Sequence, residues 1–80
     1  MHETHLIEPI IKGMSEHALK EGAKAVTVIR LKVGELTGVR KESFSETFAV
    51  LSKGTLLENA KLEIAFYPGS HIEVVSFDIE

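Results

Sequence analysis

Residues 24–34 read Lys24-Ala25-Val26-Thr27-Val28-Ile29-Arg30-Leu31-Lys32-Val33-Gly34, and this pattern predicts a β-strand. Two sets of residues alternate along it. The first set, mostly apolar, is Thr27, Ile29, Leu31 and Val33, and the second, which carries the charged residues, is Val28, Arg30 and Lys32. Because successive side chains of a strand point to opposite faces, we expect one face to be buried and the other partly exposed.

A helix is predicted before this strand, over residues 5–21. Its apolar residues recur at three- and four-residue spacing and form one side: Leu6, Ile7, Ile10, Ile11, Met14 and Ala18. Pro9 cannot donate a backbone hydrogen bond, so regular helix is expected to begin near Leu6 or Ile7. Gly13 costs about 1 kcal/mol relative to alanine, which suggests that something packs closely against it.

Three further elements are predicted after the first strand and a turn at residues 34–38. A helix over residues 41–53 carries three apolar residues on one side, namely Phe44, Phe48 and Leu51. Two strands follow, one alternating over residues 61–66 and one spanning residues 72–79, with Pro68-Gly69-Ser70 predicted as a hairpin turn between them. The apolar parity changes within residues 72–79, which predicts a bulge or a late strand start.

The order helix, strand, helix, strand, strand predicts an α+β fold. One apolar side on each helix, set against a three-stranded sheet, gives a two-layer sandwich of two helices on three strands. Residues 1–80 are expected to form a single domain, because the sequence contains no repeat, linker or low-complexity segment.

Composition excludes several functions. The chain has no cysteine, which rules out disulfides, thiolate zinc sites and thiol nucleophiles. Its net charge is −3 and it has no dense Lys/Arg block, so we expect no nucleic-acid partner. No apolar stretch is long enough for a membrane span and no secretory signal is present, so a cytoplasmic location is expected.

The start of the chain, Met1-His2-Glu3, is a candidate metal site. The amine of Met1, the amide nitrogen of His2 and the imidazole of His2 can close adjacent chelate rings around one ion. The amide nitrogen or the carboxylate of Glu3 could supply a fourth donor. Planar, nitrogen-rich coordination favours Ni(II) or Cu(II) over zinc. Many chains that begin Met-His have this capacity in part, and a histidine near a terminus is usually only solvated.

The other candidate residues favour simpler interpretations. His5 is close enough in sequence to add a ligand, but a solvent-facing or capping role is expected at a helix start. His17 and His71 are expected at the surface. Glu35, Glu42 and Glu46 could gather at the second helix start, although carboxylates in a first turn are also expected from the helix dipole. No nucleophile motif, dinucleotide fingerprint or phosphate loop is present, so we expect no enzyme activity.

Several segments in register resemble the hydrogenase nickel-incorporation family (HypA/HybF). They are Met1-His2-Glu3, Glu21-Gly22-Ala23-Lys24, Val28-Ile29-Arg30-Leu31-Lys32-Val33-Gly34-Glu35-Leu36-Thr37-Gly38-Val39, Phe48-Ala49-Val50-Leu51, Gly54-Thr55 and Ala60-Lys61-Leu62-Glu63-Ile64. The combination of Met-His-Glu with Val-Gly-Glu-Leu-x-Gly-Val is the specific part. The resemblance implies a nickel metallochaperone that serves NiFe-hydrogenase precursors, works with a GTPase and in some organisms also serves urease. It further implies a Ni(II) site at Met1 and His2, with Glu3 in a supporting role.

The chain departs from the family pattern in three places. The family's zinc-binding lobe, with its Cys-x-x-Cys pairs, is expected to be absent between Tyr67 and His71, so no zinc is expected. Arg40 stands where some members place an acidic residue proposed to assist the metal, and a cation facing the site would disfavour nickel. Pro9 lies in a helix that other members form without it.

A second interpretation remains open. The domain could be an interaction module that docks the GTPase or the hydrogenase large-subunit precursor, with metal binding secondary or lost. The missing lobe and Arg40 both favour it. A thin core and a free sheet edge also make a homodimer plausible, including one in which the last strand is exchanged across the joint at Pro68-Gly69-Ser70.

Overall fold

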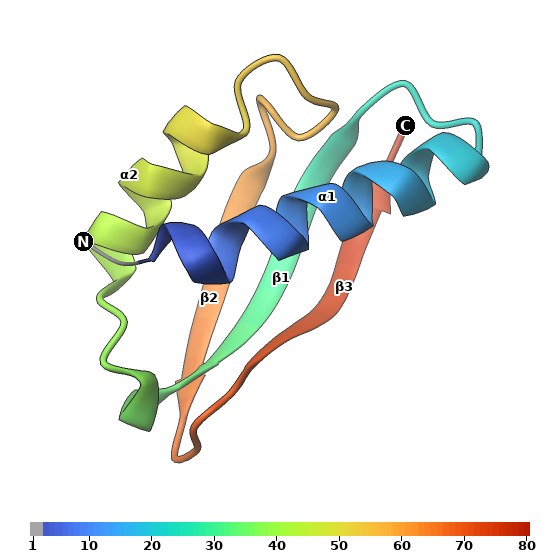
Figure 1. The fold of residues 1–80 in the computed structure, drawn as a ribbon. Helices are drawn as coiled ribbons and strands as arrows, with labels where there is room; N and C mark the ends of the chain where they lie inside the picture. The colour runs from blue at the N-terminus through green and yellow to red at the C-terminus, as the bar shows by residue number, and fades with distance from the viewer. Residues whose placement is uncertain (1–2) are drawn as a thin grey trace.

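The strand predicted at residues 24–34 lies at the centre of the sheet. The computed structural model describes residues 3–80 (Figure 1). In it, β1 (Val26–Gly34) lies between β2 (Lys61–Tyr67) and β3 (Ile72–Ile79). β1 pairs in parallel with β2 and antiparallel with β3. The predicted three-stranded sheet is therefore confirmed.

Two helices lie together on one face of this sheet (Figure 1). They are α1 (Thr4–Lys20) and α2 (Lys41–Leu51), and a short 3₁₀ helix, η1 (Glu35–Thr37), follows β1. Two neighbouring parallel strands need a long connection between them, and α2 lies in the connection between β1 and β2. The predicted order and the two-layer α+β sandwich are confirmed. No helix within residues 3–80 is long and apolar enough to cross a membrane.

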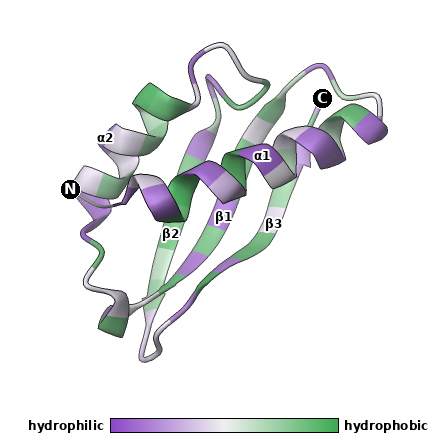
Figure 2. Ribbon diagram, in the orientation of Figure 1, coloured by the Kyte–Doolittle hydropathy of each residue, from purple (hydrophilic) through white to green (hydrophobic). Residues whose placement is uncertain are grey.

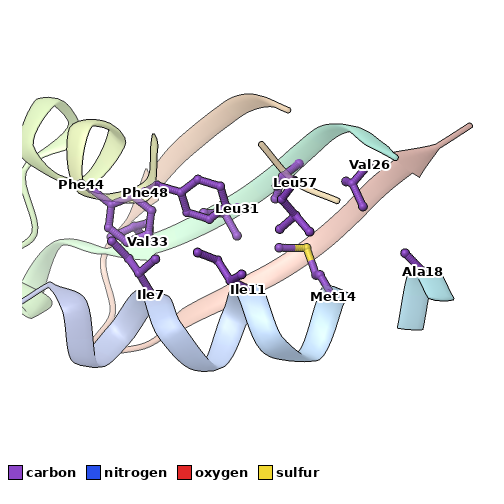
Figure 3. Packing of buried hydrophobic residues seen from close by; sticks show 11 residues of the cluster. Ile7, Ile11, Met14, Ala18, Val26, Leu31, Val33, Phe44, Phe48 and Leu57 are labelled. Carbon is purple, nitrogen blue, oxygen red and sulfur yellow. The ribbon is translucent and has the colours of Figure 1, made fainter. Parts of the chain in front are cut away.

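The core fills the space between the helices and the sheet. Three of the four residues expected on the buried face of β1 are buried, with Ile29, Leu31 and Val33 at most 2% exposed. The fourth, Thr27, is only half-buried, because the strand register shifts between Val26 and Val28 and Val26 is buried instead. Figure 3 shows side chains of α1 directed toward β1 and α2. Figure 2 shows hydrophilic and hydrophobic stretches alternating along α1. The remaining core residues come from α1, β1, α2 and the segment after α2: Ile7, Ile11, Met14, Ala18, Val26, Phe44, Phe48 and Leu57.

Helix α1 differs from its prediction at two positions. It begins at Thr4, ahead of the expected start, because the Glu3 carbonyl accepts hydrogen bonds from the amides of Leu6 (2.9 Å) and Ile7 (3.0 Å). The first turn is thus closed before Pro9, and α1 continues through Pro9 to Lys20. The expectation of close packing at Gly13 is wrong, since a Cβ placed there would meet no atom within 4 Å.

The predicted hairpin between the last two strands is also wrong. Because β2 and β3 flank β1, residues 68–71 must cross over the end of β1. The Gly34 amide donates to the His71 carbonyl (2.8 Å), and the Leu36 amide donates to the Gly69 carbonyl (2.9 Å). A Cβ on Gly34 would overlap the Gly69 carbonyl group and lie 2.7 Å from the Ser70 nitrogen. The crossing therefore requires glycine at the end of β1.

The predicted irregularity in the last strand is a β-bulge. Ser76 pairs with Arg30 and Val74 pairs with Leu31, so Val75 is an extra residue on β3. An extra residue of this kind reverses the parity of the strand. The bulge explains why apolar residues before and after Val75 can point to the same face of the sheet although their sequence parity differs.

The face of the sheet away from the helices carries an ion-pair network across all three strands. The Arg30 guanidinium on β1 donates to both carboxylate oxygens of Asp78 on β3, at 3.0 and 3.1 Å. Its Nε lies 3.3 Å from a carboxylate oxygen of Glu63 on β2. The hydrogen bond between Arg30 and Asp78 lowers the pKa of Asp78 and raises the pKa of Arg30. The network joins both outer strands to β1.

Candidate functional site

Glu3 is the residue of the candidate site that the structure describes, and it is tied to both helices. Its main-chain carbonyl accepts the first two amide hydrogen bonds of α1. Its side chain reaches α2, where the Ser43 hydroxyl donates to Glu3 Oε2 at 2.8 Å. Only 7% of Glu3 is exposed. Glu3 therefore links the beginning of α1 to the first turn of α2.

A carboxylate is chemically suited to this position. Ser43 is the third residue of α2, so the Glu3 carboxylate lies against the helix end where the dipole is positive. A hydrogen bond from a hydroxyl to a carboxylate is also stronger than one between neutral groups. Both effects stabilise a buried Glu3 side chain.

An open hollow of about 570 Å³ adjoins Glu3. It lies among the N-terminal end of α1, the loop after η1 and the first turns of α2, and is lined by Glu3, Leu6, Thr37, Gly38, Val39, Arg40, Ser43 and Thr47. The loop is shaped by Thr37, whose hydroxyl donates to the Gly34 carbonyl (2.7 Å) and accepts from the Val39 amide (3.2 Å). Gly38 adopts a left-handed conformation with φ of 75°, which favours glycine.

Arg40 lines the same hollow as Glu3. It directly precedes α2, and its carbonyl accepts a hydrogen bond from the Phe44 amide (2.9 Å). Arg40 and Glu3, two residues of opposite charge, therefore contribute to the lining of one hollow. Whether Arg40 faces the proposed ligands depends on Met1 and His2, which lie outside the described residues, so its effect on nickel stays a prediction.

The structure places the other candidate ligands as follows. Met1 and His2 lie outside the described residues. His5 and His17 are exposed on α1, and the His17 ring meets Phe77 edge-on at 5.4 Å. His71 is exposed in the joint before β3. Within residues 3–80, no group of three or more His, Cys, Asp or Glu side chains is arranged to hold a metal ion.

The three candidate carboxylates near the start of α2 lie in two elements. Glu35 begins η1, Glu42 lies in the first turn of α2, and Glu46 lies further along that helix. All three are exposed. The position of Glu42 fits the expected helix-dipole interaction.

Sequence reasoning did not identify Ser43 as part of the site. Ser43 and Glu3 are separated by 40 positions. Neither lies in an apolar repeat that would predict the contact, and a serine in a first helical turn is common for local reasons. Only the packing of α1 beside α2 brings these two side chains together.

Comparison with known proteins defines the class of this domain. The sequence profile of a family described as "Hydrogenase/urease nickel incorporation, metallochaperone, hypA" matches residues 1–72, which include Met1-His2-Glu3 and the whole hollow. By its description, the family is one of nickel metallochaperones. The chain belongs to the HypA family.

Curated relatives carry the same family name. The chain is 45% identical over 65 residues to a hydrogenase maturation factor HypA of Archaeoglobus fulgidus, covering 81% of this chain and 59% of that protein. It is 40% identical over 68 residues to the HypA of a Roseiflexus species, covering 85% of this chain and 55% of that protein. The chain therefore spans little more than half the length of these relatives.

Solved structures share the fold. The solution structure of the nickel metallochaperone HypA from Helicobacter pylori superposes with a TM-score of 0.83 at 18% identity, covering 99% of this chain and 97% of that one. A second solution structure of a HypA protein gives a TM-score of 0.82 at 17% identity, covering 100% of this chain and 97% of that one. At this identity the similarity supports the fold alone.

Proposed function

We propose that this chain is the nickel-binding domain of a metallochaperone that binds Ni(II) at Met1-His2-Glu3 and delivers it for NiFe-hydrogenase assembly. The observation that supports this most directly is the family match, which begins at residue 1 and includes all three residues. Nickel is the cargo of the domain in this proposal, and the domain carries out no catalysis.

The proposed donors are the amine of Met1, the amide nitrogen of His2 and the imidazole of His2. Glu3 supports them. Its carboxylate already accepts a hydrogen bond from Ser43 and is almost fully buried, which favours an anchoring role over a place in the coordination sphere. No zinc is expected, because the chain has no cysteine and the short joint of residues 68–71 stands where the family's zinc lobe is expected.

The proposed partners are a nickel-handling GTPase and the hydrogenase large-subunit precursor, in the cytoplasm. Both outer strands, β2 and β3, have one edge that is not paired within residues 3–80. A second copy could add to either edge, and exchange of β3 across residues 68–71 remains our proposal for a homodimer.

Isothermal titration with nickel tests the proposed site. The wild-type chain is expected to bind one Ni(II), and His2→Ala is expected to abolish that binding. Because imidazole and amide nitrogens must lose protons to coordinate, binding should weaken as the pH falls below about 6.5. Unchanged affinity in His2→Ala would contradict the proposal.

Arg40 favours a second candidate function, that of an interaction module. Arg40 lines the hollow and is exposed, so its guanidinium can pair with a carboxylate of a partner protein. In this case, capture of the GTPase or the precursor would be lost in Arg40→Ala and retained in His2→Ala. The nickel proposal instead requires delivery of nickel to fail in His2→Ala.

A further inference from the structure

We infer that Ser43 is a positioning residue of the nickel site and acts through Glu3. The inference rests on the proposed nickel function. It concerns a hydroxyl on α2 that lies 40 positions from the metal-binding segment in sequence.

The geometry fixes Glu3 at two points. Its carbonyl accepts from the amides of Leu6 and Ile7, so its main chain is continuous with α1. Its carboxylate is bound by Ser43 Oγ at 2.8 Å, so its side chain is fixed to α2. The orientation of Glu3 relative to both helices is therefore determined by contacts that do not involve a metal ion.

Glu3 directly follows the proposed chelate in sequence. Its peptide nitrogen is bonded to the carbonyl carbon of His2, so fixing Glu3 restricts the positions available to the His2 main chain. Restricting ligands before the metal binds reduces the conformational entropy lost on binding. Residues that hold metal ligands in place typically change metal affinity about 10–100-fold when they are mutated.

The shared hollow adds an electrostatic reason for this arrangement. Arg40 lines the hollow together with Glu3 and Ser43, and a positive charge disfavours a cation bound close to it. Loss of the Ser43 hydrogen bond removes one of the contacts that hold the Glu3 carboxylate on α2. Ser43 therefore holds the Glu3 carboxylate on α2, and we expect this contact to favour one geometry of the chelate.

Nickel titration of position-43 variants tests this role. Ser43→Ala is expected to bind nickel roughly ten-fold more weakly, whereas Ser43→Thr keeps the hydroxyl and should retain wild-type affinity. Ser45→Ala is the matched control, because it makes the same change on the same helix at a half-buried position. Equal affinities of Ser43→Ala and wild type, or an equal loss in Ser45→Ala, would overturn the inference.

A second pair of variants keeps the test valid if Ser43→Ala destabilises the fold. Glu3→Gln retains an oxygen that can accept from Ser43, so it should lose less nickel affinity than Glu3→Ala. A double mutant Glu3→Ala/Ser43→Ala should bind no more weakly than Glu3→Ala alone. Equal losses in Glu3→Gln and Glu3→Ala, or additive losses in the double mutant, would overturn the inference.

His2→Ala separates this inference from the proposed function. If His2→Ala abolishes binding while Ser43→Ala leaves it unchanged, only the role of Ser43 is wrong. If His2→Ala also leaves binding unchanged, the nickel site itself is wrong, and the role of Ser43 fails with it.

Discussion

The carbonyl group of Gly69 occupies the space that a side chain on Gly34 would need. This contact marks the place where the joint between β2 and β3 passes over the end of β1. It is reinforced by the hydrogen bond from the Leu36 amide to the Gly69 carbonyl and by that from the Gly34 amide to His71. The short connection and the central position of β1 therefore depend on one close backbone approach.

Gly34→Ala is expected to destabilise the domain by about 1–3 kcal/mol, because a methyl group would force two backbone segments apart. Urea unfolding followed by circular dichroism measures the change. Gly13→Ala adds the same methyl group in open space and is the control. An unchanged unfolding midpoint in Gly34→Ala would show that the joint does not pack on β1 as described.

Gly13→Ala is expected to stabilise the domain by about 0.5–1 kcal/mol. Gly13 lies within α1, its added Cβ meets nothing within 4 Å, and alanine is the better helix former. Gly22→Ala is the contrasting variant, since Gly22 has a φ of 75° after the helix and should cost about 1–2 kcal/mol. Thermal unfolding of both variants measures the two changes in stability. Equal changes for Gly13→Ala and Gly22→Ala would contradict this prediction.

Asp78→Asn is expected to lower the stability of the domain in a pH-dependent manner. The pKa of Asp78 is lowered from its ordinary value of 3.8 by the hydrogen bond from Arg30. Its stabilising contribution is therefore fully present above pH 3.8 and is lost as the pH falls through the lower, folded-state pKa. Urea midpoints of wild type and variant should differ at pH 6 and converge in strong acid.

Glu46→Gln is the control for this pH dependence, because it removes an exposed carboxylate from α2. Its urea midpoint should follow that of the wild type over the same range. A difference between wild type and Asp78→Asn that stays constant down to pH 2 would exclude the Arg30–Asp78 pair as its source.

The sequence predicted the elements of this fold more reliably than their arrangement. Alternation at Ile29, Leu31 and Val33 and the spacing of Phe44 and Phe48 follow directly from the periods of strand and helix. The order β2-β1-β3 does not, because β2 and β3 have similar local patterns. A short Pro-Gly connection is compatible both with a hairpin and with a crossing over β1. Non-local contacts, such as those of Arg30 with both outer strands, distinguish the crossing from the hairpin.

The candidate site was predictable only in part. The sequence offers the donors of Met1 and His2 as candidate ligands, and the family resemblance favours nickel as the metal; the ligands themselves stay a prediction. The burial of Glu3 and its hydrogen bond to Ser43 could not be predicted, since no periodicity relates two polar residues on different helices. The position of Arg40 beside the same hollow could not be predicted either, because it depends on the geometry of the loop around Gly38.

The most direct test of the central claim compares nickel binding by the chain with a free amine on Met1 and by the same chain extended by Gly-Ser-Gly-Ser. The extension preserves His2, Glu3 and Ser43 but removes the amine from the proposed chelate. The free chain is predicted to bind one Ni(II) and to show the weak yellow absorption band of square-planar nitrogen coordination, and the extended chain is predicted to lose both. Equal affinity and an identical visible spectrum for the two chains would contradict a nickel site built at Met1-His2-Glu3.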